Sequence, residues 1–267
     1  MILKGSDIKV TAIHLKVKQL IVTQNAKRYL DISDFIVRQN RVTALIGPSG
    51  SGKTLFTKSL FHQLPSSMHI EHVAFQYHTT DMTDLKSLLG KHIGYVSQDY
   101  LYTFNDHTTL DKQLEQLYRY HKPSSKIDAQ RKIQQALEWV GLGELNLKKR
   151  YRFMLSGGQL QRLAIASVMM LEPEMIIADE PTASLDVVSG ARIIQLLQHL
   201  VEKHDVTLVI ITHDLAHVAQ LCDDLYIIDQ GKIVASGPYK TFNRAHEHPL
   251  VSQLFQYRRA IQRGQVR

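Results

Sequence analysis

The sequence has one cysteine, Cys222, among 267 residues. A single thiol excludes a fold held by disulfide bonds and a zinc site built from cysteines, and it suits a reducing compartment. Long hydrophobic runs are also absent. The longest, over 163–171 and 206–211, fall well short of the roughly 18 residues that a membrane-spanning helix needs. No signal segment is visible either. We therefore expect a protein that is soluble, or that joins a membrane through a partner.

The sequence has a net positive charge but no nucleic-acid recognition motif. There are 32 lysines and arginines against 25 acidic residues, a net charge of +7. Much of the excess lies near the C-terminus, where a solvated terminal helix is the favoured interpretation and contact with lipid headgroups the second. We expect no nucleic-acid partner, because no nucleic-acid motif accompanies the charge. The residues concerned are Arg258, Arg259, Arg263 and Arg267.

The hydrophobic content of 44 % is enough for a buried core and excludes a disordered, collagen-like or coiled-coil chain. Alternation of polar and apolar side chains predicts strands within 8–46, and the apolar run 42–46 predicts a buried parallel strand. Apolar residues at helical spacing predict two helices within 99–155. After that segment, helix and strand alternate, which favours a parallel sheet covered by helices. The elements expected there are helices at 157–171 and 187–203 and strands at 175–178 and 206–211.

The segment 47–54 matches the pattern G-x-x-x-x-G-K-[ST] in full. Its glycines let backbone N–H groups approach a phosphate, and the N-terminus of a helix expected at 55–63 favours an anion. Lys53 supplies a charge for the β- and γ-phosphates, and the Thr54 hydroxyl can bind Mg²⁺. The strand before and the helix after favour a nucleotide site over a chance glycine turn. The candidate residues are Gly47, Pro48, Ser49, Gly50, Ser51, Gly52, Lys53 and Thr54.

The apolar strand expected at 175–178 ends in two acids, Asp179 and Glu180. In an α/β sheet, ligands bind at the carboxyl ends of parallel strands. Asp179 can hold Mg²⁺, directly or through water, and Glu180 can act as general base on an attacking water. Exposed acids are common at strand ends, so this interpretation depends on the phosphate loop.

A second glycine-rich element, Leu-Ser-Gly-Gly-Gln, occupies 155–159. We expect Ser156 to cap the helix that follows and the glycines to let an anion approach the backbone. One phosphate group rarely needs two such elements in one chain. The sequence therefore predicts a dimer in which this element of one subunit faces the phosphate loop of the other.

At this point the sequence resembles the ATP-binding cassette (ABC) ATPases. The resemblance runs from about Leu15 to the glycine-rich segment 229–237, and five motifs occur in the order of that family. They are the phosphate loop, Gln98 after a strand, the 155–159 signature, the acidic strand end and His213 after a strand. Ser184-Leu185-Asp186 is similar to the D-loop of the family.

The resemblance implies an α/β phosphate-loop domain with an N-terminal antiparallel β subdomain and an inserted helical lobe. The core would comprise 1–98 and 156–240, the lobe 99–155, and a C-terminal helical tail 241–267. It also implies that Glu180, His213 and Gln98 are catalytic, with ATP and Mg²⁺ as cofactors. The further roles are metal binding by Thr54, Gln98 and Asp179, and nucleotide binding across a dimer seam by Ser156, Gly157, Gly158, Gln159 and Asp186.

The lobe resembles the group of ABC importers for oligopeptides, dipeptides and nickel. Tyr151 stands four residues before the signature, as in the Tyr-Pro-x-x-Leu-Ser-Gly-Gly form, with Arg152 in place of proline. The usual Leu-Asn-Pro after Gln98 is Phe104-Asn105-Asp106 here, and His248-Pro249-Leu250 is similar to a His-Pro-Tyr of that group. The implied function is ATP hydrolysis that powers uptake of peptides, nickel or metal chelates.

The implied partners are separate permease subunits, a second ABC ATPase subunit paired head to tail and, indirectly, an extracytoplasmic substrate-binding protein. The implied location is the cytoplasmic face of the membrane. An ABC exporter, a lipoprotein-release system and a non-transport ABC ATPase remain the alternatives.

Two features depart from the family or stay open. The register that usually carries an adenine-stacking aromatic holds Gln24, and the nearest aromatic is Tyr29; Asn40-Arg41 replaces the usual Gly-Glu. Four histidines, His62, His69, His72 and His78, gather in 62–78, where His69 and His72 would pair only on a helix. Because the region is more typical of strand and loop, we interpret them as exposed rather than as a metal site.

Overall fold

The computed structural model describes residues 12–215, 221–243, 248–249 and 251–252. The strand expected at 8–12 and most of the C-terminal tail expected at 241–267 lie outside the described residues. Within them, no helix is long and apolar enough to cross a membrane.

An antiparallel sheet forms the N-terminal part. Strands β1 (Ile13–Gln24) and β2 (Lys27–Arg38) make a hairpin whose turn residues, Asn25 and Ala26, have positive φ. Together with β4 (His69–Tyr77) and β5 (Thr80–Met82) they give the order β2-β1-β4-β5. The expected antiparallel β subdomain is thus confirmed.

A mixed sheet of order β10-β9-β3-β8-β7-β6 forms the centre, parallel except for β10 at its edge. Three of its strands, β3, β7 and β8, are buried along their whole length because helices or the other sheet cover both faces. The short apolar runs were sufficient to predict β3, β7 and β8. The strands are β3 (Val42–Ile46), β6 (Ile93–Val96), β7 (Met175–Asp179), β8 (Thr207–Thr212), β9 (Asp224–Asp229) and β10 (Lys232–Pro238).

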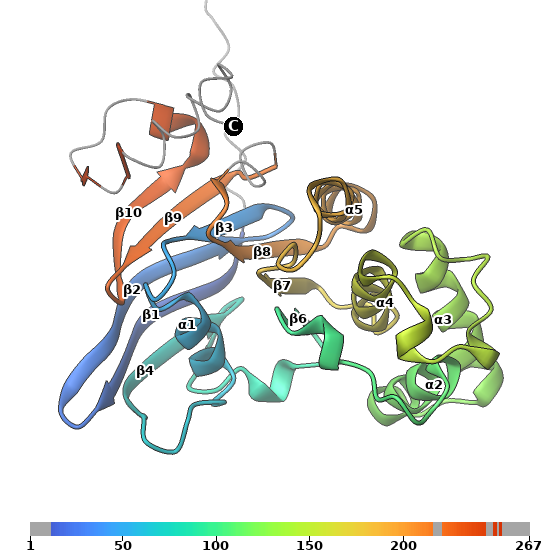
Figure 1. Cartoon of the computed structure of the whole chain (residues 1–267). Coiled ribbons are helices and arrows are strands. Elements are labelled where there is room, and N and C mark those ends of the chain that lie inside the picture. The colour runs from blue at the N-terminus through green and yellow to red at the C-terminus, as the bar shows by residue number, and fades with distance from the viewer. Residues whose placement is uncertain (1–11, 216–220, 244–247, 250, 253–267) are drawn as a thin grey trace, which may run out of the picture.

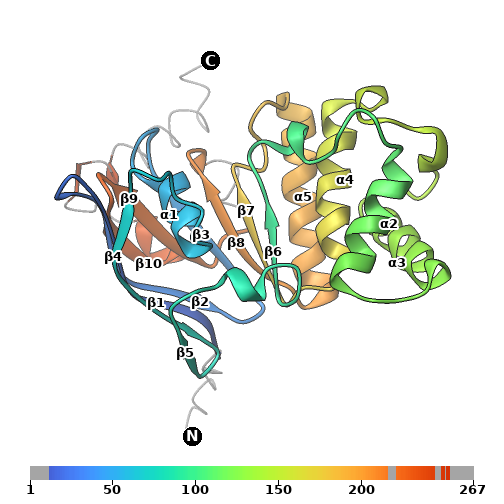
Figure 2. The same cartoon turned by 90° about the horizontal axis from the view of Figure 1, so that it is seen from below.

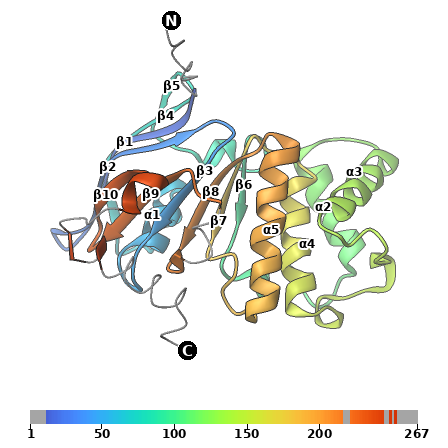
Figure 3. The same cartoon turned by 90° about the horizontal axis from the view of Figure 1, so that it is seen from above.

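The central sheet separates two hydrophobic cores. Leu208 and Ile210 of β8 belong to one, and Val209 and Ile211 to the other. Helix α1 (Lys53–Leu60) fills the second core against the antiparallel sheet. On the opposite face lie α4 (Gly157–Met169) and α5 (Val187–His204), side by side in Figures 2 and 3. This layering brings the loop before α1 to the carboxyl edge of the sheet.

A helical lobe lies between β6 and α4 in the chain, at the opposite end of the molecule from the antiparallel sheet (Figure 1). Its helices are α2 (Leu110–His121) and α3 (Lys126–Trp139). Ser125 caps α3 by accepting a hydrogen bond from the Asp128 N–H. Five short 3₁₀ turns complete the described elements: η1 (Lys86–Leu88), η2 (Tyr100–Tyr102), η3 (Leu147–Lys149), η4 (Arg152–Met154) and η5 (Tyr239–Asn243).

Two expectations differ from the structure in detail. Helix α1 starts at Lys53 rather than residue 55 and ends at Leu60 rather than 63, since the glycine loop itself supplies the first turn. The pair His69 and His72 lies on strand β4, so the helical spacing on which a ligand pair depends is absent. The two histidines therefore do not form a ligand pair.

The packing of β6 on α4 depends on Gly94. A Cβ at this position would lie 2.1 Å from Val168 Cγ1 and 3.3 Å from Pro173 Cγ. We expect Gly94→Ala to lower the free energy of unfolding by about 1–3 kcal/mol, as overpacking does. Urea denaturation measures it. The control Gly143→Ala faces only the movable Glu138 side chain and should change stability by less than about 0.5 kcal/mol. Equal losses in both variants would contradict this account.

Candidate active site

The loop 47–54 joins β3 to α1 at the carboxyl edge of the central sheet. Gly50 and Gly52 have φ of 79° and 109°, a backbone region that favours glycine. Gly47 packs against the end of β9, where a Cβ would lie 2.2 Å from the Ile228 carbonyl oxygen. The Gly231 N–H in the β9–β10 turn donates to the Ser51 carbonyl at 2.8 Å. Neighbouring backbone thus fixes the shape of the loop.

Lys53 lies in the centre of this loop and is only 7 % exposed. Its Nζ donates to the carbonyls of Gly47 at 2.8 Å and Pro48 at 3.1 Å. The same ammonium group lies 3.6 Å from Glu180 Oε1, which follows β7. A buried cation needs such partners, because burial of an unpaired charge is costly.

Asp179, the last residue of β7, is almost fully buried. Its Oδ2 accepts hydrogen bonds from Thr57 Oγ1 at 2.9 Å and Tyr95 Oη at 3.1 Å. Burial raises the pKa of this carboxyl group, while the two hydrogen bonds oppose the shift. Its other oxygen, Oδ1, is buried without a hydrogen-bond partner among the described residues. An unsatisfied buried carboxylate oxygen is costly, so it indicates a ligand position.

Glu180 adopts a left-handed backbone with φ of 46°, and its N–H donates to the Ile211 carbonyl at 2.7 Å. Thr212 Oγ1 donates to its Oε2 at 3.1 Å. His213 Nδ1 lies 3.1 and 3.0 Å from the two carboxylate oxygens. Residues at the end of β8 therefore hold the carboxylate in one orientation, and the left-handed backbone of Glu180 carries strain that is common at functional sites.

Gln98 lies in the turn after β6 and is exposed. Its side chain makes no hydrogen bond to the part of the chain that the structure describes. The fold thus places Gln98 at the same carboxyl edge as Asp179, because β6 and β7 are parallel neighbours, but gives it no fixed contact.

The signature begins helix α4. Ser156 and Gln159 form a capping box, in which Gln159 N–H donates to Ser156 Oγ at 3.3 Å and Ser156 N–H to Gln159 Oε1 at 3.0 Å. The expected cap at Ser156 is confirmed. Ser156 itself is exposed, and Gly157 and Gly158 leave the helix N-terminus uncovered by side chains of their own. This geometry suits an anion.

Asp186 caps helix α5 beside the signature. Its Oδ1 accepts hydrogen bonds from the N–H groups of Val188 at 3.0 Å and Ser189 at 2.9 Å. Hydrogen bonding by the Ser189 side chain, and then by these N–H groups, lowers the pKa of the carboxyl group. A Cβ on Gly158 would lie 3.6 Å from Ser189 Oγ, so the two helix starts are adjacent. Val187 and Val188 are strongly exposed there.

The predicted site residues therefore form two groups. The phosphate loop, Glu180 and His213 are joined by direct contacts, and Asp179 is bonded to α1 through Thr57. The signature and Asp186 gather at the starts of α4 and α5. Gln161 connects them, because its buried Nε2 donates to the Pro181 carbonyl at 3.0 Å, one residue after Glu180.

Sequence reasoning missed the residues that orient the carboxylates. Thr57 lies four residues after Lys53, on the same face of α1, and that spacing could have identified it. Thr212 immediately precedes His213. Tyr95 and Gln161 carry no comparable sequence signal, because only the pairing of β6 with β7 and the packing of α4 bring them into place.

The two candidates for adenine stacking lie outside the phosphate loop. Gln24 ends β1, and the Tyr29 ring is covered by Lys27 Nζ at 5.2 Å from its centroid. Leu30 contacts the loop, since its Cδ2 would lie 2.9 Å from a Cβ on Gly52. Tyr29 stands where the pairing of β2 with β1 shifts register, and its side chain is 38 % exposed.

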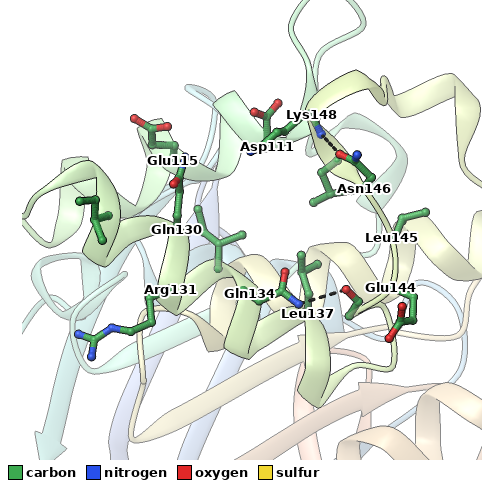
Figure 4. A pocket seen from close by; sticks show the side chains of 14 residues that line it. Asp111, Glu115, Gln130, Arg131, Gln134, Leu137, Glu144, Leu145, Asn146 and Lys148 are labelled. Atoms are coloured by element: carbon green, nitrogen blue, oxygen red, sulfur yellow. Dashed lines mark hydrogen bonds between the residues drawn. The ribbon is translucent and has the colours of Figure 1, made fainter.

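A separate cavity of about 660 Å³ lies in the helical lobe, between α2, α3 and the segment 143–148 (Figure 4). Asp111, Glu115, Gln134 and Lys148 are among its lining residues, and none of the predicted site residues lines it. This hollow therefore plays no part in the candidate active site.

Comparisons with known proteins agree with the geometry. The sequence model of the ABC transporter family matches residues 30–183. The nickel import system ATP-binding protein NikD of Staphylococcus aureus is 42 % identical over 250 residues, which cover 93 % of this chain and 97 % of that protein. NikD of another strain of this species is 44 % identical over 86 % of this chain and 90 % of that protein.

Solved structures show the same fold. The structure of cbiO1 from Clostridium perfringens, described as part of the ABC transporter complex cbiONQ, has a TM-score of 0.77 at 23 % identity. It covers 94 % of this chain and 96 % of that chain. MJ1267, an ATP-binding cassette of an ABC transporter, has a TM-score of 0.73 at 23 % identity over 92 % of this chain and 99 % of its own.

Proposed function

The chain belongs to the ABC transporter family, and on this basis we propose that it is the ATP-hydrolysing subunit of a nickel importer. Identity of 42 % to the S. aureus nickel import protein over 93 % of the chain carries the proposal. The substrate would be the nickel ion or a nickel chelate, and peptides are the second substrate class that the lobe resembles. Specificity for the substrate would reside in other chains.

ATP would bind with its phosphates in the loop 47–54. Backbone N–H groups and the N-terminus of α1 favour the anion there, and Lys53 offers a cation at the loop centre. Loop carbonyls hold Lys53 Nζ at the position where phosphate oxygens would meet it.

The chain also fits Mg²⁺. Asp179 Oδ1 is a buried carboxylate oxygen with no hydrogen-bond partner among the described residues, and hard oxygen ligands are those that Mg²⁺ prefers. Asp179, Thr54 and Gln98 would hold the ion, directly or through water. When bound, the ion neutralises charge on the phosphate oxygens. Thr57 and Tyr95 keep the Asp179 carboxylate turned so that Oδ1 is the free oxygen.

Glu180 would act as general base toward the water that attacks the γ-phosphate. Thr212 and His213 hold its carboxylate, and Lys53 lies close enough to stabilise its negative charge. His213, at the edge of the site, would in turn contact the γ-phosphate. The protein's contribution is to position the groups and to stabilise charge, as is usual in phosphoryl transfer.

A second ATPase subunit would complete each site. The signature and Asp186 lie at the starts of α4 and α5, apart from the phosphate loop of their own chain. The exposed Val187 and Val188 beside them suit an interface with apolar contacts. We infer a head-to-tail dimer in which Ser156 and Gly158 bind the nucleotide of the partner.

The lobe would bind a permease subunit through an exposed apolar patch. The patch comprises Leu101 and Tyr102 of η2 and Phe153 and Met154 of η4, which are 43 to 80 % exposed. Arg152 holds the two turns together by hydrogen bonds to Asp106 at 2.8 Å and to the Leu101 carbonyl. These contacts connect the turn after Gln98 to the signature.

The protein would lie at the cytoplasmic face of the membrane, attached through the permease subunits, with an extracytoplasmic substrate-binding protein on the other side. Nickel uptake would follow from closing of the dimer on ATP and opening after hydrolysis.

The first test is ATPase activity with and without the permease subunits and the partner ATPase. We expect turnover that depends on those subunits and that falls by at least about 100-fold in Glu180→Gln, since the general base is lost. Equilibrium binding of ATP should persist in that variant. Nickel uptake by vesicles that contain the assembled complex identifies the substrate. Full turnover by the lone chain, unaffected by any permease, would contradict the importer.

Thr57→Ala tests how Asp179 is oriented. Removal of the hydroxyl leaves Asp179 Oδ2 with Tyr95 alone, so we expect the Mg²⁺ concentration for half-maximal ATPase activity to rise by about 10-fold. The matched control is Ser59→Ala on the same helix, because Ser59 Oγ bonds only to the Leu55 carbonyl. If Thr57→Ala needs the same Mg²⁺ concentration for half-maximal ATPase activity as the unchanged chain, this role is contradicted.

Phe153→Ser tests the permease patch. We expect stimulation of the ATPase by the permease to fall by about 10-fold or more, because the variant removes an exposed ring from the contact. Tyr120→Ser, which removes an 82 % exposed ring from α2, is the control and should leave stimulation unchanged. Loss of stimulation in both variants, or in neither, would place the permease contact elsewhere.

A further inference from the structure

Three histidines from separate parts of the chain surround Glu174 at the edge of the sheet opposite the active site. His14 belongs to β1, His78 follows β4, and His92 precedes β6. Glu174 immediately precedes β7. The cluster differs from the four histidines that gather in the sequence at 62–78, since only His78 belongs to both.

The ligand atoms converge on one carboxylate. His78 Nε2 lies 3.0 Å and His14 Nε2 3.5 Å from Glu174 Oε2, while His92 Nδ1 lies 2.7 Å from Oε1. One atom each from His14, His78 and Glu174 lie within 4.8 Å of one another. Neighbouring ligand atoms on a tetrahedral metal are about 3.3 Å apart, given bonds of about 2.0–2.1 Å. The distances from His14 and His78 to Glu174, 3.5 and 3.0 Å, are close to that value, and the exposed His78 and Glu174 side chains leave room for adjustment.

Other groups already support the histidines in the orientation that a metal requires. His14 Nδ1 is bonded to Thr207 Oγ1 at 2.8 Å, and with the proton on Nδ1 its Nε2 carries a lone pair, 3.0 Å from Tyr77 Oη and 3.5 Å from Glu174 Oε2. His78 Nδ1 is likewise within 3.0 Å of Gln39 Nε2, an amide that can turn its oxygen to the ring. Such partners on the second nitrogen are typical of metal-binding histidines.

His14 is almost fully buried, so its ring is held in place beside Glu174. Tyr77 donates to Glu174 Oε2 at 3.1 Å and holds the carboxylate toward the rings.

We propose that His14, His78 and Glu174, with His92 beside them, bind one late first-row divalent metal ion of the Ni²⁺ and Zn²⁺ class. Imidazole nitrogen with a single carboxylate is a donor set that favours these ions over Mg²⁺. The site is separate from the nucleotide site, because Glu174 and Asp179 lie at opposite ends of β7, about 16 Å apart along the strand.

A bound ion would fasten the antiparallel sheet to the central sheet. His14 and His78 come from the former, whereas His92 and Glu174 lead into β6 and β7 of the latter. Because the ion would bind the folded state and not the separated sheets, its binding raises the stability of the whole chain.

The test is titration of the tag-free, EDTA-treated full chain with NiCl₂ and with ZnCl₂ in excess Mg²⁺, followed by calorimetry and thermal unfolding. We expect about one ion per chain at micromolar or lower Kd, and a rise in Tm of about 5 °C at saturation. Glu174→Gln and His78→Ala should each weaken binding by at least about 10-fold. His78 is partly exposed, so its variant keeps the test valid if Glu174→Gln unfolds.

The control is His72→Ala, which removes an exposed histidine of β4 outside the cluster and should leave the Kd unchanged. If His72→Ala weakens metal binding as much as His78→Ala does, the ions bind to scattered surface histidines, and the proposed site is overturned. Absence of saturable binding to the wild-type chain would overturn it as well. Both results are independent of ATPase activity and of nickel transport.

Discussion

The buried ammonium group of Lys53 is the interaction on which the active site depends. It satisfies two carbonyls of the glycine loop and lies 3.6 Å from Glu180, so it joins the loop after β3 to the end of β7. A charge with so little exposure requires these partners in fixed positions. Glu180 is fixed in turn by Thr212 and His213 from the end of β8. Three strand ends thereby share one electrostatic network.

The parallel sheet gives the chain two chemically different edges. At the carboxyl edge, carboxylates and the helix N-terminus after the loop suit phosphates and a hard cation. At the opposite edge, imidazoles surround Glu174 and suit a softer ion. Strand β7 connects the two, since Glu174 precedes it and Asp179 ends it. The same geometry that concentrates ligands at one end of a sheet brings loop residues together at the other.

Two residues at which the sequence departs from the importer pattern form an ion pair with each other in the structure. Asp106 and Arg152 each stand where related sequences usually have proline, and they form a bidentate ion pair with both N···O distances at 2.8 Å. Proline would stiffen each turn separately, whereas the ion pair joins the turns and also contacts Leu101. The lobe thus keeps the turn after Gln98 fixed to the signature by a different physical means.

The sequence by itself determined the elements whose signal is local. The phosphate loop, the apolar strands β3, β7 and β8, and the cap at Ser156 follow from glycine spacing, continuous burial and a hydroxyl before a helix. Only the tertiary structure decided which side chains meet. Tyr95 reaches Asp179 through strand pairing, and His14 reaches Glu174 across 159 intervening positions because two sheets pack together. Such contacts leave no local trace, since long-range packing imposes no period on the sequence.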